Sequence, residues 1–268
     1  MSVLEQRDRE FFRENGFLII DSGISETVLD QVIADMDPYW SGVKPKRVSQ
    51  ADRRRIQDAW RISRSVKSLA TSPKILGVLG ALFGAKPLPF QTLNFPKGTQ
   101  QETHSDSVHF NSEPFGMMCG VWIALEDIGP DQGPLIYYPG SHRLAEANYR
   151  EAGVEAGLEN YGGYLGFVEE TIEREGLREE LGILKKGQAL VWAANLLHGG
   201  SKQNDLSLSR HSQVTHYYFE GCKYWRPHMS EEERYYFEPR WIPYPGDGKR
   251  AYRLLKPLKR MKRYVFGK

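Results

Sequence analysis

The stretch QQETHSDSVHF, residues 100–110, gathers side chains that bind metals and transfer protons. It contains His104 and Asp106, separated by one residue. In an extended strand, residues i and i+2 point to the same face, so both side chains could reach one metal ion. His-x-Asp also occurs by chance, and the alternative is a hydrogen-bonded pair on the protein surface.

A third ligand is available far along the chain. His198 ends the apolar run ALVWAANLLHGG, which we predict to be a strand that stops beside Gly199 and Gly200. Two histidines and one carboxylate on one face of an octahedron leave the opposite positions open, as in non-haem Fe(II) oxygenases. We therefore predict a metal site of His104, Asp106 and His198.

A cationic residue follows this third histidine. Arg210 lies twelve residues past His198, so a hairpin would place it on the neighbouring strand, with Ser212 on the same face. A buried guanidinium without a partner is costly, whereas an arginine fork binds a carboxylate through two charge-assisted hydrogen bonds. The pair predicts a dicarboxylate co-substrate with one end on the metal.

The elements that would position these residues are β-rich from residue 87 onward. Apolar runs broken by Gly and Pro predict an antiparallel sandwich or barrel. Helices are predicted over 5–14, from Ser25, and over 72–84, with a strand at 16–21. Because the helices precede the strands, the pattern favours an α+β fold.

A Glu-rich insertion at residues 143–186 separates the core strands. Insertions of this length are often lids or binding loops. Within it we predict a helix over 168–184 and a loop over the Gly-rich 159–167. Without an internal repeat or a linker, we predict a single domain over residues 1–268.

Five motifs resemble the phytanoyl-CoA dioxygenase-like branch of the Fe(II)/2-oxoglutarate oxygenases. In chain order they are THSD (103–106), VWIALED (121–127), GPLIYYPGSH (133–142), LLHGG (196–200) and Arg210-x-Ser212. The resemblance implies a double-stranded β-helix, a cupin-like barrel, with helices on one side. It also implies iron on His104, Asp106 and His198, 2-oxoglutarate held by Arg210 with Ser212 assisting, and O₂ as oxidant.

The same resemblance suggests that Gln91, Asn94 and Trp122 lie beside 2-oxoglutarate. Trp122 is explained equally well as a core residue. Gln91 and Asn94 are three positions apart, so strand alternation cannot aim both inward without a bulge.

Halogenating relatives carry Gly or Ala at the position of Asp106, so the carboxylate implies oxygenation. The predicted function is hydroxylation of a small molecule while 2-oxoglutarate is decarboxylated to succinate. Two alternatives stay open. One is a cupin-like binding protein for a glycan or lipid that keeps its metal without turnover. The other is a metal enzyme without 2-oxoglutarate, which would leave Arg210 and Ser212 without a role.

The other histidines have plainer interpretations. We expect His109 to lie next to the ligands or in a loop, and His142 to belong to a structural turn. His216 shares strand parity with Arg210, so it is a candidate for the pocket wall, whereas His211 should face away.

Composition sets the broad class. The chain of 268 residues has a net charge of +2, but residues 249–268 contain nine Lys and Arg and no acid, which leaves −7 elsewhere. We expect this basic tail to pack as an amphipathic helix or to contact an anionic membrane surface weakly, and we do not expect nucleic-acid binding. Two cysteines, no signal peptide and no long apolar run predict a cytoplasmic protein without a transmembrane segment. The oligomeric state is not readable from the sequence.

Overall fold

The computed structural model describes residues 4–41, 55–230 and 232–245. The basic tail at 249–268 lies outside the described residues, so the expectations about it stay predictions.

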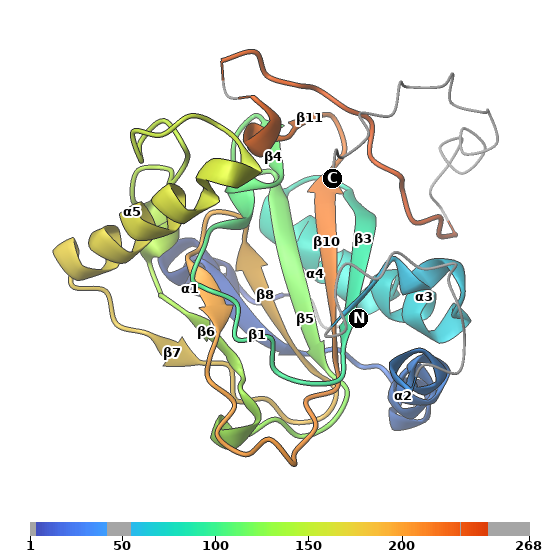
Figure 1. The fold of residues 1–268 in the computed structure, drawn as a ribbon. Helices are drawn as coiled ribbons and strands as arrows, with labels where there is room; N and C mark the ends of the chain where they lie inside the picture. Colours follow the sequence, from blue (N-terminus) through green and yellow to red (C-terminus); the bar gives the residue numbers. More distant parts are fainter. Residues whose placement is uncertain (1–3, 42–54, 231, 246–268) are drawn as a thin grey trace, which may run out of the picture.

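A six-stranded antiparallel sheet forms the centre of the molecule, in the order β1-β8-β5-β10-β3-β2 (Figure 1). The central strand β10 (Ser212–Phe219) lies between β3 (Pro87–Phe95) and β5 (Met118–Ala124). The outer strands are β1 (Phe17–Asp21), β8 (Gln188–Ala193) and β2 (Ile56–Gln57). The predicted combination of helices and antiparallel strands is confirmed.

Four helices pack on one face of this sheet: α1 (Gln6–Asn15), α2 (Glu26–Trp40), α3 (Arg64–Ala70) and α4 (Pro73–Phe83). Helix α3 begins at Ser63, whose side chain accepts a hydrogen bond from the Val66 amide. Helix α4 begins with a proline and ends at Gly84, which has φ 67°, as its sequence signals predict.

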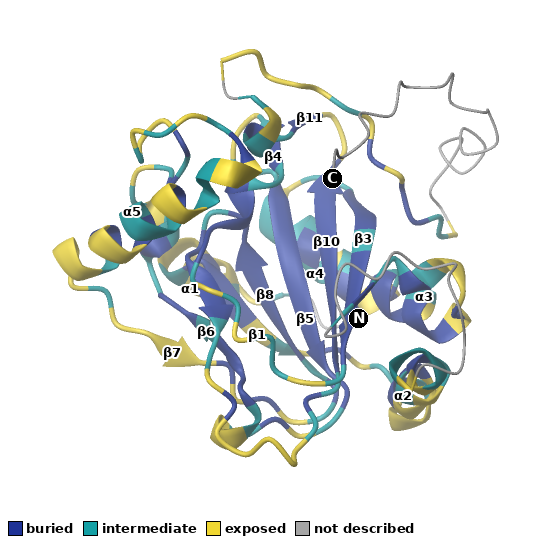
Figure 2. Cartoon of the chain, in the orientation of Figure 1, coloured by how far each residue is buried: buried dark blue, intermediate teal, exposed yellow. Residues whose placement is uncertain are grey.

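Strand alternation divides the sheet into two faces. Along β5, Val121 and Ile123 pack against the helices, whereas Trp122 and Ala124 belong to a second core cluster on the opposite side. Nearly all of these central strands are buried, as the dark ribbons of Figure 2 show. The second face is the one that carries the chemistry described below.

Two small sheets complete the fold. One has the order β7-β6-β9, formed by β7 (Glu180–Leu181), β6 (Leu135–Tyr137) and β9 (His198–Gly200). The other pairs β4 (Asn111–Glu113) with β11 (Lys223–Trp225). Leu135 and Tyr137 of β6 pack with Trp122 in the second cluster, so this layer covers the sheet face opposite the helices.

The insertion differs from its prediction. Helix α5 (Tyr161–Arg174) begins inside the Gly-rich stretch predicted to be a loop, and it ends ten residues before the predicted end at residue 184. Tyr164, Val168 and Thr171 form a buried stripe at helical spacing, so tertiary packing outweighs the low helix propensity of glycine. The later part of the predicted helix instead supplies β7, which pairs with β6.

One described stretch, Arg64–Phe83, is long and apolar enough by composition to cross a membrane. It comprises α3 and α4, which are separate helices on either side of Thr71 and Ser72. Core helices pass the same test, and residues of both helices are buried in the first core cluster.

The segment before His104 lies directly against β9. His104 and His198 exchange two backbone hydrogen bonds, 2.8 and 2.9 Å long, and the Gly200 amide donates to the Gln101 carbonyl. A Cβ atom on Gly199 would lie 2.8 Å from the Gln101 oxygen and 3.1 Å from the Thr103 Cα. The missing side chain therefore permits this close approach of two backbones.

We expect Gly199→Ala to lower the free energy of unfolding by about 1–3 kcal/mol, because the added methyl group meets backbone that cannot rotate away. Gly166→Ala is the matched control. Gly166 lies within α5, where an added Cβ would meet no described atom within 4 Å, so this change should raise stability by about 0.5–1 kcal/mol. Urea unfolding measures both. Equal effects of the two changes would contradict a special constraint at β9.

Candidate metal centre

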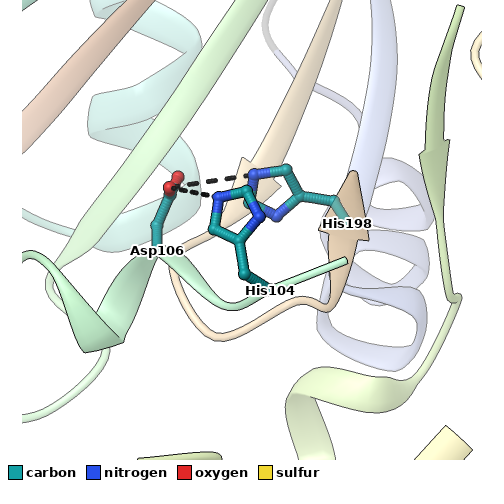
Figure 3. Close-up of side chains that lie close together, drawn as sticks. All are labelled: His104, Asp106 and His198. Atoms are coloured by element: carbon teal, nitrogen blue, oxygen red, sulfur yellow. Dashed lines mark ion pairs between the residues drawn. The ribbon is translucent and has the colours of Figure 1, made fainter. Parts of the chain in front are cut away.

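Three buried side chains converge at one point. His104, Asp106 and His198 each offer a ligand atom, and these atoms lie within 4.8 Å of one another. The Asp106 Oδ1 atom is 3.7 Å from the His104 Nε2 and 3.8 Å from the His198 Nε2. Figure 3 shows both imidazole rings beside the carboxylate.

The local backbone differs from the predicted strand. His104 forms an isolated bridge with His198, Ser105 is extended, and Asp106 is the first residue of a short 3₁₀ helix, Asp106–Val108. The Ser107 amide donates to the Ser105 Oγ, which supports this turn. The two ligands therefore meet through a bridge followed by a turn, and not through strand alternation.

His198 also sits differently from its prediction. Strand β8 ends at Ala193, and His198 begins the separate strand β9, which includes both glycines. The ligand is thus held by pairing on both sides, to His104 and to Tyr137 of β6.

Each histidine is oriented by a backbone carbonyl. The Nδ1 of His104 donates to the Glu102 oxygen and that of His198 to the Leu196 oxygen, both at 2.9 Å. A carbonyl oxygen only accepts, so Nδ1 carries the proton and Nε2 keeps its lone pair, as in metal-binding histidines. The Gln101 amide donates to the His104 Nε2 at 3.1 Å, a bond that a metal ion would replace.

The Asp106 carboxylate has two further partners. The Trp192 Nε1 donates to Oδ2 at 2.9 Å, and the His216 Nε2 lies 3.5 Å from the same oxygen. Burial alone would raise the pKa of Asp106, but the electrostatic effect of the neighbouring His198 and His216 imidazoles outweighs burial and holds this pKa well below its usual range. Burial lowers the pKa of His198 to about 4, which favours its neutral, metal-binding form at neutral pH.

The sequence gives no sign that Trp192 belongs to the site. It stands in the apolar run ALVWA of β8, where a tryptophan is typical of a core. A Cβ on Gly120, in the neighbouring strand, would lie 2.1 Å from the Trp192 Cζ2. Gly120 therefore gives the indole the space in which it reaches Asp106.

This donor set fits a divalent metal of the non-haem iron type. Two neutral imidazoles and one carboxylate are oriented by neighbouring groups, and they lie on the wall of a cavity of about 440 Å³. The cavity leaves room for further metal ligands on the side opposite the three protein side chains.

Arg210 lines the same cavity and is buried. It precedes β10, and β10 does not pair with β9, so the predicted hairpin is wrong. Its guanidinium lies 5.6 Å from the Phe95 ring and 5.4 Å from the Trp122 ring. Burial lowers the pKa of Arg210 to about 10, so it remains a cation at neutral pH.

The Arg210 guanidinium keeps unused donors. It donates to the Gly133 carbonyl at 3.1 Å and to the Lys97 carbonyl at 3.3 Å, and among the described residues its buried Nε has no hydrogen-bond partner. Ser212 is fully buried, but its Oγ donates to the Arg210 carbonyl at 3.4 Å and it does not line the cavity. The arginine is thus placed to bind an anion without direct help from Ser212.

Gln91 and Asn94 lie on opposite faces of β3. Gln91 lines the cavity, and its Oε1 is 2.9 Å from the His216 Nδ1. Asn94 is not among the lining residues, and its amide donates to Gln213 instead. The irregularity in β3 lies between Pro89 and Gln91, which pair with Tyr217 and His216. It precedes both Gln91 and Asn94, so it does not turn Asn94 toward the cavity.

The remaining histidines divide between the cavity wall and positions away from it. His216 lines the cavity, and so does His109, whose pKa burial lowers to about 3 with help from His104. His142 belongs to a short turn and its Nε2 contacts the Arg13 carbonyl. His211 is half-buried and does not line the cavity.

The insertion supports the metal-binding segment. The Ser105 amide, between the two ligands, donates to the Tyr164 hydroxyl of α5 at 2.9 Å. Tyr164 and Val168 pack with Val108 and Leu197, next to the metal ligands, in one buried cluster. Helix α5 therefore braces the site, a role that its sequence did not reveal.

A family comparison matches most of the chain. The model of the family described as "Phytanoyl-CoA dioxygenase (PhyH)" covers residues 12–212. Rat peroxisomal phytanoyl-CoA dioxygenase is 25% identical over 253 residues, which is 83% of this chain and 71% of the rat protein. The mouse phytanoyl-CoA dioxygenase domain-containing protein 1 is 32% identical over 80 residues, only 28% of either protein.

Solved structures share the fold. The non-haem α-ketoglutarate-dependent carbocyclase SnoK from nogalamycin biosynthesis aligns with a TM-score of 0.65 and 18% identity, over 97% of this chain and 94% of SnoK. The epimerase SnoN in complex with Fe³⁺, α-ketoglutarate and nogalamycin RO gives 0.63 and 19%, over 90% and 96%. EctD from S. alaskensis with 2-oxoglutarate and 5-hydroxyectoine gives 0.63 and 19%, over 80% and 76%.

We expect Trp192→Phe to weaken divalent-metal binding by about 10- to 100-fold, because Asp106 loses a hydrogen bond that orients it. Titration with Co²⁺, followed by its absorption spectrum, measures the affinity. Trp241→Phe is the matched control, since it removes an indole donor to the Glu238 carboxylate and Trp241 does not line the cavity. Equal metal affinity in the two variants would contradict the role of Trp192.

Proposed function

The chain belongs to the phytanoyl-CoA dioxygenase family of non-haem iron- and 2-oxoglutarate-dependent oxygenases, and from this premise we propose that it hydroxylates a small molecule. The observation that carries the proposal is the convergence of His104, Asp106 and His198 on one cavity wall with Arg210 in the same cavity. The co-product would be succinate.

We also propose that the sheets form a double-stranded β-helix. Two antiparallel layers, the six-stranded sheet and the β7-β6-β9 sheet, enclose the second core cluster. The likeness to iron- and 2-oxoglutarate-dependent enzymes supports this architecture. The ligands would then lie inside the barrel, between its two layers.

His104, Asp106 and His198 would hold the iron, which when bound supplies the activation of O₂ that oxidises 2-oxoglutarate and the substrate. Trp192 keeps the carboxylate of Asp106 turned toward the two Nε2 atoms. The backbone carbonyls of Glu102 and Leu196 keep both Nε2 atoms free of protons.

Arg210 would bind the distal carboxylate of 2-oxoglutarate. A guanidinium has five N–H donors, and two are used by the Gly133 and Lys97 carbonyls. The rings of Phe95 and Trp122 flank it and exclude water, which strengthens a charge-assisted bond. We assign Trp122 and Gln91 to the surroundings of the co-substrate, whereas the placement of Asn94 and Ser212 argues against direct contacts from them.

The substrate would be a small molecule, because the ligands line a cavity of about 440 Å³. The alternative of a binding protein without turnover is disfavoured, since the triad, its orienting groups and Arg210 are all present. We keep the cytoplasmic location and the weak membrane contact of residues 249–268 as proposals from the sequence.

We expect His104→Ala and Asp106→Ala to abolish succinate formation in the presence of Fe²⁺, 2-oxoglutarate and O₂, because each removes a ligand atom. His211→Ala is the control histidine, half-buried and outside the cavity, and should keep the wild-type rate. Succinate is measured by mass spectrometry. Full turnover in both ligand variants would rule out this metal site.

We expect Arg210→Ala to weaken 2-oxoglutarate binding by about 1.5–3 kcal/mol, because a charged hydrogen-bonding partner is lost. Arg210→Lys should recover part of the affinity, since it keeps the charge without the fork geometry. Calorimetric titration of 2-oxoglutarate into the Ni²⁺-loaded protein measures both. An unchanged affinity in Arg210→Ala would place the distal carboxylate elsewhere.

A further inference from the structure

A second arginine lines the cavity away from Arg210. Arg226 follows β11 and precedes a short 3₁₀ helix, Pro227–Met229. Its guanidinium carbon lies 5.3 Å from the Phe110 ring and 4.6 Å from the Phe237 ring. Stacking against two rings holds the flat cation in place while leaving its in-plane donors available.

Arg226 has no carboxylate partner within the described parts of the chain. Burial lowers its pKa from the usual value, and the nearby Tyr218 hydroxyl group opposes this shift. Arg234, in the same C-terminal segment, differs: it stacks on Trp225 and also pairs with Glu113 at 3.2 Å. A half-buried cation that faces a cavity without an acid partner is costly unless a ligand supplies the anion.

The two arginines serve different ends of the cavity. Arg210 stacks on Phe95, at one end of β3, whereas Arg226 stacks on Phe110, which packs against Phe90 at 5.2 Å. Phe95 lies five positions after Phe90 along β3, a span of roughly 17 Å. If 2-oxoglutarate places its distal carboxylate on Arg210 and its other end on the metal, neither carboxylate is left for Arg226.

The charges on the cavity wall also favour an anionic ligand. Its described lining residues include three arginines, the third being Arg55, and a single acid, Asp106. Iron(II) and the 2-oxoglutarate dianion cancel each other's charge, so the described part of the cavity wall keeps a net positive charge when the cavity is loaded. Such a wall attracts an anion into the remaining space.

We propose that the primary substrate is an organic acid whose carboxylate is bound by Arg226. Its apolar body lies along Phe110, so that the carbon to be oxidised faces His104, Asp106 and His198 across the cavity they share. The inference rests on the proposed function, because it assigns Arg226 to the substrate only if Arg210 takes the co-substrate.

The test uses protein loaded with Ni²⁺, a redox-inert substitute for iron, and saturated with 2-oxoglutarate so that Arg210 is occupied. Binding of 3-phenylpropionate and hexanoate is compared with binding of the matching amides by ligand-observed NMR. At least one acid should bind about tenfold or more tightly than its amide, the effect of one charge-assisted pair. Arg226→Gln should abolish this preference, and Arg226→Lys should retain part of it.

Arg234→Gln is the matched control, a stacked arginine that already has an acid partner and does not line the cavity. It should keep the wild-type preference for the acid. The absence of any preference in the wild type, or its survival in Arg226→Gln, would overturn the inference while leaving the reaction class intact. Failure of the wild type to bind Ni²⁺ or 2-oxoglutarate would overturn the proposed function and the inference together.

Discussion

The carboxylate of Asp106 is a charge buried inside the protein, and much of the surrounding structure compensates it. An isolated buried carboxylate would take up a proton and cease to bind a metal. Here the Trp192 indole donates to one oxygen, His216 lies near the same oxygen, and the two other ligands face Oδ1. Each partner comes from a different element, so the site exists only in the completed fold. Gly120 and Gly199 also support the site, since each lacks a side chain where a neighbouring group must approach closely.

Side chains alternate along the central strands, so one face of the sheet packs the helix-covered core and the other lines the candidate site. One face of β5 and β8 contributes Val121, Ile123 and Val191 to the helix-covered core, which the four N-terminal helices complete. The other face contributes Trp122 and Trp192, which contact Arg210 and the Asp106 carboxylate, respectively. Because neighbouring residues serve opposite faces, the wall of the site is fixed by the same register that builds the core.

The sequence predicted best what depends on residue type and local order. The ligand types, the helix signals around α4 and the inward parity of His216 all follow from short patterns. It failed where distant packing decides. A tryptophan in an apolar run gives no sign that its N–H meets a carboxylate, and Gly-rich residues enter α5 because Tyr164 and Val168 find buried positions there. The position of Arg210 depends on strand order. A hairpin inferred from spacing alone would pair β10 with β9, whereas β10 lies between β3 and β5 in the six-stranded sheet.

The insertion contains two parts with different roles, which its sequence does not distinguish. Its helical half is anchored: the Tyr164 hydroxyl accepts the Ser105 amide, so moving α5 would strip a hydrogen bond from the backbone between two metal ligands. An element bonded in this way is poorly suited to be a lid that opens in each catalytic cycle. The preceding turn is different, because Leu158 lines the cavity and yet is 59% exposed. Substitution there costs little stability. Variation in substrate choice is therefore expected at the turn before α5, while the helix itself is constrained by the metal site.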